Sequence, residues 1–133
     1  MFKCGDAFLM AQPRVSTAHL WIVLTEASSA TDKAVIVNVT TLREGSDTTA
    51  ILKSGDHPFI VKPSVIYFHG ALIVDLAMIE EGFSAHVCTP QPPCSPDLIA
   101  RIQRGLLESE FTPDRVARFY RRVVAGTASG KTG

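Results

Sequence analysis

The chain has neither a net charge nor a long apolar run. Its 133 residues carry 13 Lys and Arg against 13 Asp and Glu, so the molecule as a whole has no strong attraction for nucleic acid or for a membrane surface. The longest apolar stretch, residues 71–79, is interrupted by Asp75 and is shorter than the roughly 20 residues that a membrane-spanning helix needs. The start of the chain lacks the continuous apolar segment of a secretory signal. We therefore expect a cytoplasmic protein with no membrane partner.

Cysteine is also scarce. The chain has three cysteines, which are Cys4, Cys88 and Cys94. An odd number favours reduced thiols over a disulfide framework. His86 could join Cys88 and Cys94 as a zinc ligand, but the spacing is wide and no fourth ligand is evident. We therefore expect no metal and no other cofactor.

The first two thirds of the chain read as β-structure. Short runs of β-branched and aromatic residues alternate with turn residues, which is typical of a small, strongly curved sheet or barrel and not of βαβ units. The strands that we expect are Ala7–Met10, His19–Thr25, Ala34–Thr41, Thr49–Leu52, Val65–Phe68 and Ala71–Val74. A short extended piece at Phe59–Val61 and a single helical turn at Leu76–Gly82 complete this part.

The last third reads as helical. Residues 89–96 contain four prolines and predict an extended linker. Ser95-Pro96-Asp97 and Thr112-Pro113-Asp114 each combine a capping side chain, a proline and an acid, so they predict two helix starts. We expect one domain over residues 1–125, with the barrel at 1–88, helices within 97–125 and a disordered tail at 126–133. The basic excess here, which is Arg115, Arg118, Arg121 and Arg122, favours a solvated helix face over an RNA-docking surface.

The most unusual local sequence is Gly55-Asp56-His57-Pro58-Phe59-Ile60. Glycine and proline predict a rigid, exposed loop that presents His57, an imidazole able to exchange a proton near neutral pH. Ser64 and Tyr67 follow and could bind a phosphate or orient a base. The simpler alternative is that Asp56 and His57 cap a turn while Tyr67 packs its ring.

Further candidates lie at strand ends. His19 opens an apolar strand, and from the residues alone a strand-edge histidine with a satisfied ring is the favoured interpretation. Thr41 closes the next strand, and its hydroxyl together with Arg43 could hold a phosphate. Lys53 precedes the histidine loop and could add positive charge.

Residues 5–80 resemble the PemK/MazF-like toxins. The resemblance rests on Gly5-Asp6-Ala7-Phe8 before a first strand, followed by HLWIVLT and by AVIVNVTT, which ends in threonine. It is closer to a branch that shares H-x-W-x-V, G-D-H-P-F-I and S-x-V-x-Y. It implies an SH3-like β-barrel that often dimerises, cleaves RNA without a metal and is neutralised by an antitoxin. It also implies a phosphate-binding role for Thr41. The arginine that the family carries before the preceding strand is replaced here by Ala18-His19.

The resulting hypothesis is a toxin-like, metal-independent endoribonuclease that cleaves single-stranded RNA. His19 and His57 would share the acid and base roles, which requires that both rings face one groove. Thr41, Ser64 and Arg43 would hold the phosphate, and Lys53 and Tyr67 would bind substrate. One alternative is a non-catalytic SH3-like module that binds RNA or a protein. Another is a subunit whose C-terminal helices pack on an antitoxin or on a second copy of the chain.

Overall fold

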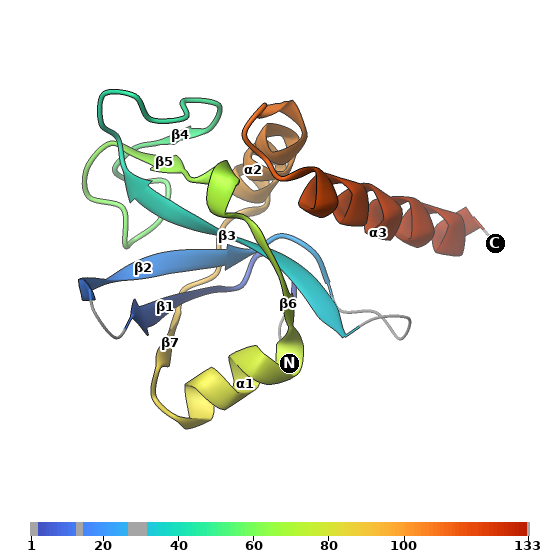
Figure 1. Cartoon of the computed structure of the whole chain (residues 1–133), viewed down its shortest axis with the longest axis horizontal. Helices are drawn as coiled ribbons and strands as arrows, with labels where there is room; N and C mark the ends of the chain where they lie inside the picture. Colours follow the sequence, from blue (N-terminus) through green and yellow to red (C-terminus); the bar gives the residue numbers. More distant parts are fainter. Residues whose placement is uncertain (1–2, 13–14, 27–31, 133) are drawn as a thin grey trace.

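A computed structural model describes residues 3–12, 15–26 and 32–132 and shows a mainly β protein with helices (Figure 1). The strands are β1 (Ala7–Gln12), β2 (Val15–Val23), β3 (Lys33–Thr41), β4 (Ile51–Leu52), β5 (Ser64–Ile66), β6 (Leu72–Asp75) and β7 (Cys88–Gln91). The helices are the short η1 (Phe68–Gly70), α1 (Leu76–Ser84), α2 (Pro96–Glu108) and α3 (Asp114–Thr132). No helix in this described part combines the length and the hydropathy that crossing a membrane requires.

The strands form one antiparallel sheet in the order β4-β5-β3-β2-β1-β7, and β6 also pairs with β3. The long strand β3 makes this possible because its first half pairs with β6 and its last residues pair with β5. Among the described strands, β4 and β7 end the path without pairing with each other, so the sheet is open. The expected β-rich fold with C-terminal helices is confirmed at this level.

Side chains alternate between two apolar faces of the sheet, as the two-residue period of a strand requires. One face carries Leu20 and Ile22 of β2 and packs on α2. The opposite face carries Trp21 and Val23 and packs on α1. The residues that α2 and α3 bury against the first face are Leu98, Ile99, Ile102, Leu106, Val116 and Tyr120.

The start of α2 follows the predicted capping pattern. The Ser95 hydroxyl accepts a hydrogen bond from the backbone N–H of Leu98 at 3.2 Å, with Pro96 in the first turn. Further along, α2 approaches the sheet closely at Gly105, where an added Cβ would lie 2.7 Å from Cζ of Phe68. The absence of a side chain at this position therefore sets the distance between the helix and the sheet.

Several elements differ from the sequence-based expectations. Strand β2 begins at Val15, where we expected a start at His19, and Phe59–Val61 belongs to no strand. Part of the proline-rich linker is strand β7, which pairs with β1 and tolerates Pro90 because it lies at the sheet edge. Helix α1 has nine residues where we expected a single turn. Helix α3 runs to Thr132, through the segment that we expected to be a disordered tail.

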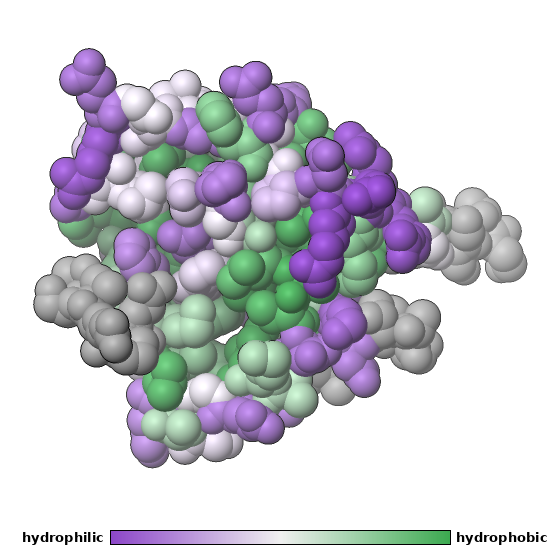
Figure 2. Space-filling model, in the orientation of Figure 1, coloured by the Kyte–Doolittle hydropathy of each residue, from purple (hydrophilic) through white to green (hydrophobic). Residues whose placement is uncertain are grey.

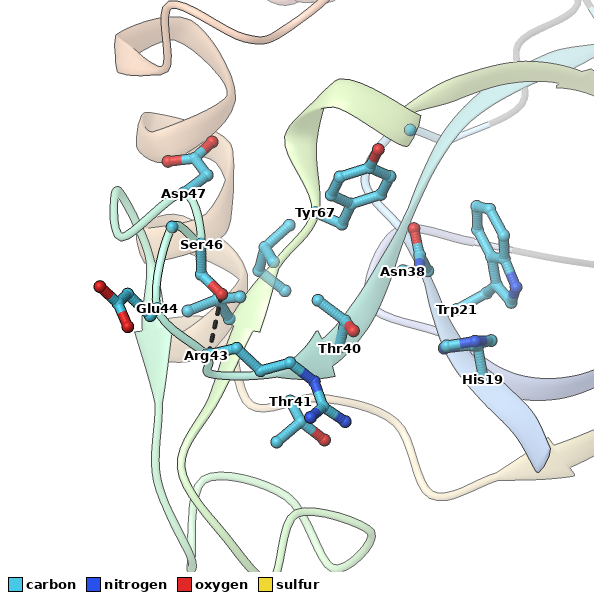
Figure 3. A pocket seen from close by; sticks show the side chains of 14 residues that line it. His19, Trp21, Asn38, Thr40, Thr41, Arg43, Glu44, Ser46, Asp47 and Tyr67 are labelled. Atoms are coloured by element: carbon cyan, nitrogen blue, oxygen red, sulfur yellow. Dashed lines mark hydrogen bonds between the residues drawn. The ribbon is translucent and has the colours of Figure 1, made fainter.

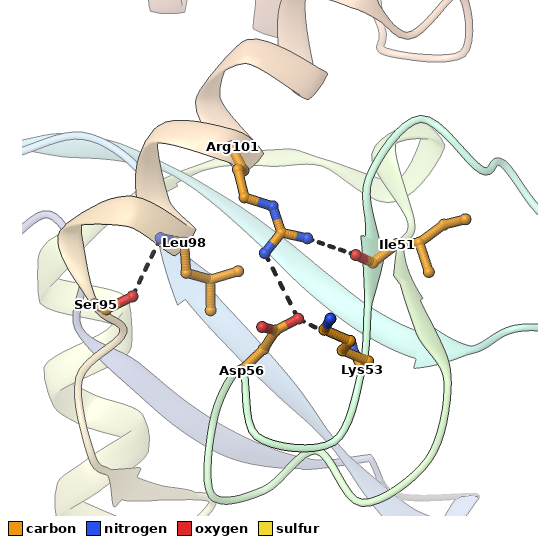
Figure 4. Close-up of polar contacts among 6 residues, drawn as sticks. All are labelled: Ile51, Lys53, Asp56, Ser95, Leu98 and Arg101. Carbon is orange, nitrogen blue, oxygen red and sulfur yellow. Dashed lines mark hydrogen bonds and ion pairs between the residues drawn. The ribbon is translucent and has the colours of Figure 1, made fainter.

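The loop at residues 53–60, which contains His57, lies beside α2 and is linked to it by polar contacts (Figure 4). The Arg101 guanidinium donates to the carbonyl oxygen of Ile51 at 2.7 Å and lies 3.6 Å from the Asp56 carboxylate. That carboxylate accepts the backbone N–H of Lys53 at 2.9 Å. The polar groups of the loop are therefore directed at the protein's own helix.

Candidate functional site

A groove of about 550 Å³ lies on the sheet face that carries Trp21 (Figure 3). We call it the His19 groove. Its walls include His19 and Trp21 from β2, Asn38 and Thr40 from β3, and Tyr67 after β5. A mostly apolar hollow with a few convergent polar groups is the usual form of a ligand site.

Strand register places these residues together. Trp21 lies directly opposite Asn38 in the β2–β3 pair, so His19 and Thr40 fall on the same face one step further along. Asn38 is 9% exposed although it is polar, and it interrupts the β-branched run of β3. On this face of β3 the apolar side chains therefore give way to polar ones at Asn38 and Thr40.

Trp21 forms part of the groove wall although it is only 5% exposed. Its indole N–H has no hydrogen-bond partner among the described residues. In Figure 3 this nitrogen lies on the side of the ring nearest His19. A buried N–H without a partner disfavours the folded state by about 1–3 kcal/mol, so such a group next to a groove is a donor that a ligand could satisfy.

His19 has one ring nitrogen engaged and one available. Its Nδ1 lies 3.3 Å from the carbonyl oxygen of Val39, and because a carbonyl only accepts, Nδ1 carries the hydrogen of that bond. In the neutral ring Nε2 then has a lone pair that can accept a proton from a ligand. The ring is half-buried at the groove, so it can act as a base there.

Arg43 stands on a turn that follows β3 directly. Its backbone N–H donates to the Ser46 hydroxyl at 2.9 Å, and the Ser46 N–H donates back to the Arg43 carbonyl at 3.1 Å. Gly45 has a φ of 86°, which a residue with a side chain adopts only with strain. The Arg43 side chain is exposed beside Thr41, and Figure 3 shows the Glu44 carboxylate on the outer side of the turn.

Asp47 anchors this turn to the end of α2. Its carboxylate accepts the Ser109 hydroxyl at 2.6 Å and the backbone N–H of Thr49 at 3.0 Å. Burial by itself would raise the pKa of Asp47, but the hydrogen bonds from Ser109 and Thr49 outweigh it and lower the pKa below its ordinary value. The Asp47 carboxylate therefore already accepts hydrogen bonds from the protein itself. Arg43 contributes the positive charge at this end of the groove.

A second hollow of about 450 Å³ shares His19, Thr41 and Arg43 with the first and adds Ser64. Ser64 is paired with Thr41 across β3 and β5. However, Ser64 is 6% exposed and its hydroxyl donates to the Lys62 carbonyl at 2.9 Å. Ser64 thus lies near the other candidates, but its hydroxyl already has an internal partner.

Tyr67 presents an open aromatic surface. It is 43% exposed, and its ring meets that of His69 edge-on at 5.9 Å. Exposed aromatic rings beside a positive charge are suited to stacking a planar group such as a nucleobase. Sequence reasoning identified Tyr67, and the structure brings it to the same groove as His19 and Arg43.

His57 does not reach either hollow. Its loop is largely exposed, as expected, but the expectation that the loop presents the His57 ring is wrong. The residue is 3% exposed, and its Nε2 lies 2.7 Å from the carbonyl oxygen of Pro92. Its Nδ1 accepts the backbone N–H of Phe59 at 3.0 Å. Both ring nitrogens are thus occupied by the backbone, which is the turn-capping alternative. The two imidazoles do not share a groove.

Lys53 also lies apart from the groove. Lys53 is exposed on the loop beside α2 and lines neither of the two hollows. A cation at this position contributes little to the binding of a phosphate near Arg43, because solvent strongly screens the interaction between exposed charges. Within the described residues, no cluster of three or more His, Cys, Asp or Glu could hold a metal ion.

Comparison with protein-family models finds no match for the chain, and no curated protein matches it either. The residues that sequence reasoning missed are Trp21 and Asn38. The signal for Asn38 was a lone amide within a run of β-branched residues. Trp21 carried no signal, because an aromatic residue in an apolar strand is ordinary core.

Proposed function

We propose that the chain binds single-stranded RNA in the His19 groove and cleaves it without a metal, as a toxin-like endoribonuclease. The observation that supports this is the convergence of His19, Thr41, Arg43 and Tyr67, from separate segments, on adjoining hollows. A base, a phosphate-binding pair and a stacking surface are the groups that RNA cleavage by the 2′-hydroxyl requires.

The proposed reaction uses the RNA's own nucleophile. His19 Nε2 takes the proton of the 2′-hydroxyl, and the 2′-oxygen forms a bond to phosphorus as the bond to the 5′-oxygen breaks. Arg43 and Thr41 hold the phosphate oxygens as charge develops on them. Tyr67 stacks a neighbouring base. The products are a 2′,3′-cyclic phosphate and a 5′-hydroxyl.

The leaving 5′-oxygen takes its proton from water in this scheme, because His57 is sealed in the loop and supplies no second imidazole. A positioned acid accelerates such a step roughly a hundred- to ten-thousandfold, so cleavage should be slow compared with that of a two-histidine enzyme. Because the His57 ring lies away from the groove, a second candidate function is also favoured. It is a non-catalytic module that binds RNA in the His19 groove.

The resemblance to the PemK/MazF-like toxins completes the proposal. It supplies the SH3-like barrel as the finer description of the open sheet, a cytoplasmic location, an antitoxin as protein partner and a homodimer as the assembly. All four are proposals that rest on the resemblance, and the antiparallel sheet bears only on the first of them.

The test uses the full chain and a labelled single-stranded RNA of mixed sequence in EDTA. Cleavage that His19→Ala abolishes, and that His86→Ala leaves unchanged, would support the ribonuclease. His86 is the matched control because it is an exposed imidazole that lines neither hollow.

Binding measured at several salt concentrations separates the two candidates. Intact RNA that binds in a salt-sensitive manner, with about tenfold weaker binding for Arg43→Ala, would assign the non-catalytic module. Cleavage that persists in the His19 variant would remove the proposed base. Failure of the wild-type chain to bind RNA at low salt would overturn both candidates.

A further inference from the structure

Strand β6 has an unpaired edge. It pairs with β3 on one side only, and no other described strand joins it. The Leu76 N–H donates to the Asp32 carbonyl at 2.8 Å, which fixes the alternation of hydrogen-bonded pairs along this ladder. Val74 and Leu72 are therefore bonded to β3, and the N–H and C=O groups of Ile73 and Asp75 point away from it.

The side chain of Ile73 lines a groove of about 660 Å³ between this part of the sheet and α3. Phe119 and Val123, one helical turn apart on α3, form the apolar wall opposite. Leu72, next to Ile73, is 44% exposed. Natural proteins usually cover or charge an apolar strand edge of this kind, because it can pair with another chain.

The rim of the groove is positively charged. Arg115, Arg118 and Arg122 lie at spacings of three and four residues, so they share the face of α3 that borders the groove. All three are exposed, and no ion pair joins any of them to a described carboxylate. In Figure 2 a strongly hydrophilic block next to α3 adjoins a hydrophobic surface at the centre of the molecule.

Among the described residues, no acidic side chain lines the groove. Asp75, the carboxylate at the end of β6, is paired with Lys33 at 2.7 Å. The unbalanced charge of the rim is therefore that of the three arginines. A ligand that brings carboxylates to this rim would form charge-assisted hydrogen bonds with guanidinium groups.

We propose that the β6 edge and the 660 Å³ groove beside it, which Ile73, Phe119 and Arg118 line, form a docking site for an extended acidic segment of a partner protein. The docked segment adds a strand to the sheet. The outward backbone groups of Ile73 supply main-chain hydrogen bonds. Alternate side chains of the added strand enter the groove, apolar ones against Phe119 and acidic ones toward Arg118 and Arg122. The proposal uses residues separate from the His19 groove and stands without the proposed function.

Two other occupants fit less well. A second copy of the chain, paired edge to edge through β6, would bring a second arginine row and no free carboxylate to the interface. Single-stranded RNA would find phosphate partners in the arginines and one ring to stack on, that of Phe119, but the strand edge offers RNA nothing comparable to the main-chain pairing of a peptide. Charge and backbone pattern together favour an acidic peptide.

The first experiment measures the binding of a labelled nine-residue peptide by fluorescence anisotropy. Its alternate positions read Glu, Val, Glu, Val, Glu, with Thr between them. Arg118→Ala and Arg122→Ala should each weaken binding about tenfold. Arg121→Ala should change it less than twofold, because Arg121 is equally exposed on α3 but does not line the groove. A peptide with Gln in place of Glu should bind at least tenfold more weakly.

The second experiment tests strand addition itself. Two versions of the peptide carry backbone N-methyl groups, one on the Thr positions and one on the Glu and Val positions. Because alternate amides of an added strand face β6, one version should lose binding and the other should keep it. In hydrogen exchange, the Ile73 amide should exchange rapidly in the free protein and slowly in the complex, whereas Val74 should be protected in both.

Several outcomes would overturn the proposal. They are no binding of the peptide, equal losses for Arg121→Ala and Arg118→Ala, or unchanged exchange at Ile73 in the complex. Protection of Ile73 without peptide in a concentration-dependent dimer would assign the edge to a second copy. RNA binding that Arg118→Ala and Arg122→Ala weaken, with the peptide inert, would assign the face to nucleic acid.

Discussion

Replacing His57 with alanine should lower the free energy of unfolding by about 3 kcal/mol and leave the chemistry of the folded protein unchanged. The substitution removes the bond to the Pro92 carbonyl and the bond from the Phe59 N–H. Each such hydrogen bond contributes about 1 kcal/mol net. The ring is 3% exposed, so its removal adds about 1–2 kcal/mol for lost packing.

Urea denaturation is the direct measurement, because the single tryptophan, Trp21, is a buried reporter of folding. For a slope of about 1.5–2 kcal/mol per molar urea, the midpoint should fall by about 1.5–2 M. His57→Gln should recover about 1 kcal/mol, because its amide can donate to the Pro92 carbonyl. His69→Ala, at an exposed imidazole, should stay within about 0.5 kcal/mol of the wild type.

A His57→Ala variant as stable as the wild type would contradict the stabilising role of the two ring hydrogen bonds. Loss of an RNA cleavage activity in the folded variant, where the wild-type chain has that activity, would give the ring a chemical role. Midpoint and activity therefore need to be measured on the same preparation of His57→Ala, at a urea concentration where it is fully folded.

Three further predictions concern packing and titration. Gly105→Ala should destabilise by about 1–3 kcal/mol because the new methyl group meets Phe68, whereas Gly126→Ala, with open space around it on α3, should stabilise by up to about 1 kcal/mol in the same urea assay. The lowered pKa of Asp47 implies stability that is present above about pH 4 and lost as the pH falls through the folded pKa. The unfolding free energies of wild type and Asp47→Asn should therefore differ by a constant amount from pH 6 to about pH 4 and converge at lower pH. Burial raises the pKa of the Cys94 thiol to about 11, so stability should fall as the pH rises from about 9 toward 11, and rapid alkylation of Cys94 in the native protein at pH 8 would contradict this.

The strands were predictable because their signal is local. Ala34–Thr41 differs from β3 by one residue, and Ala71–Val74 overlaps β6 apart from a shift of one residue at each end. The helix start at Pro96 was equally clear, because a cap, a proline and an acid act within one turn. Such signals depend only on neighbours along the chain.

The candidate site was predictable only in part. His19, Thr41, Arg43 and Tyr67 have side chains with useful chemistry, and their types alone marked them. That they share adjoining hollows follows from the register of β2, β3 and β5. His57 has an equally useful side chain, yet a carbonyl 35 residues further along the chain occupies its ring.

The amino-acid sequence by itself determined most of the strands, the starts of α2 and α3 and the residues that carry chemical groups, but not β7 or the full extent of α1 and α3. Tertiary structure decided which of those groups face solvent, because burial and pairing depend on residues distant in sequence. Asn38 and Trp21 became part of one groove because the pairing of β2 with β3 places them side by side on one face of the sheet. The open edge of β6 is likewise a property of the whole sheet, because a strand's edge is free or covered according to what the rest of the chain places beside it.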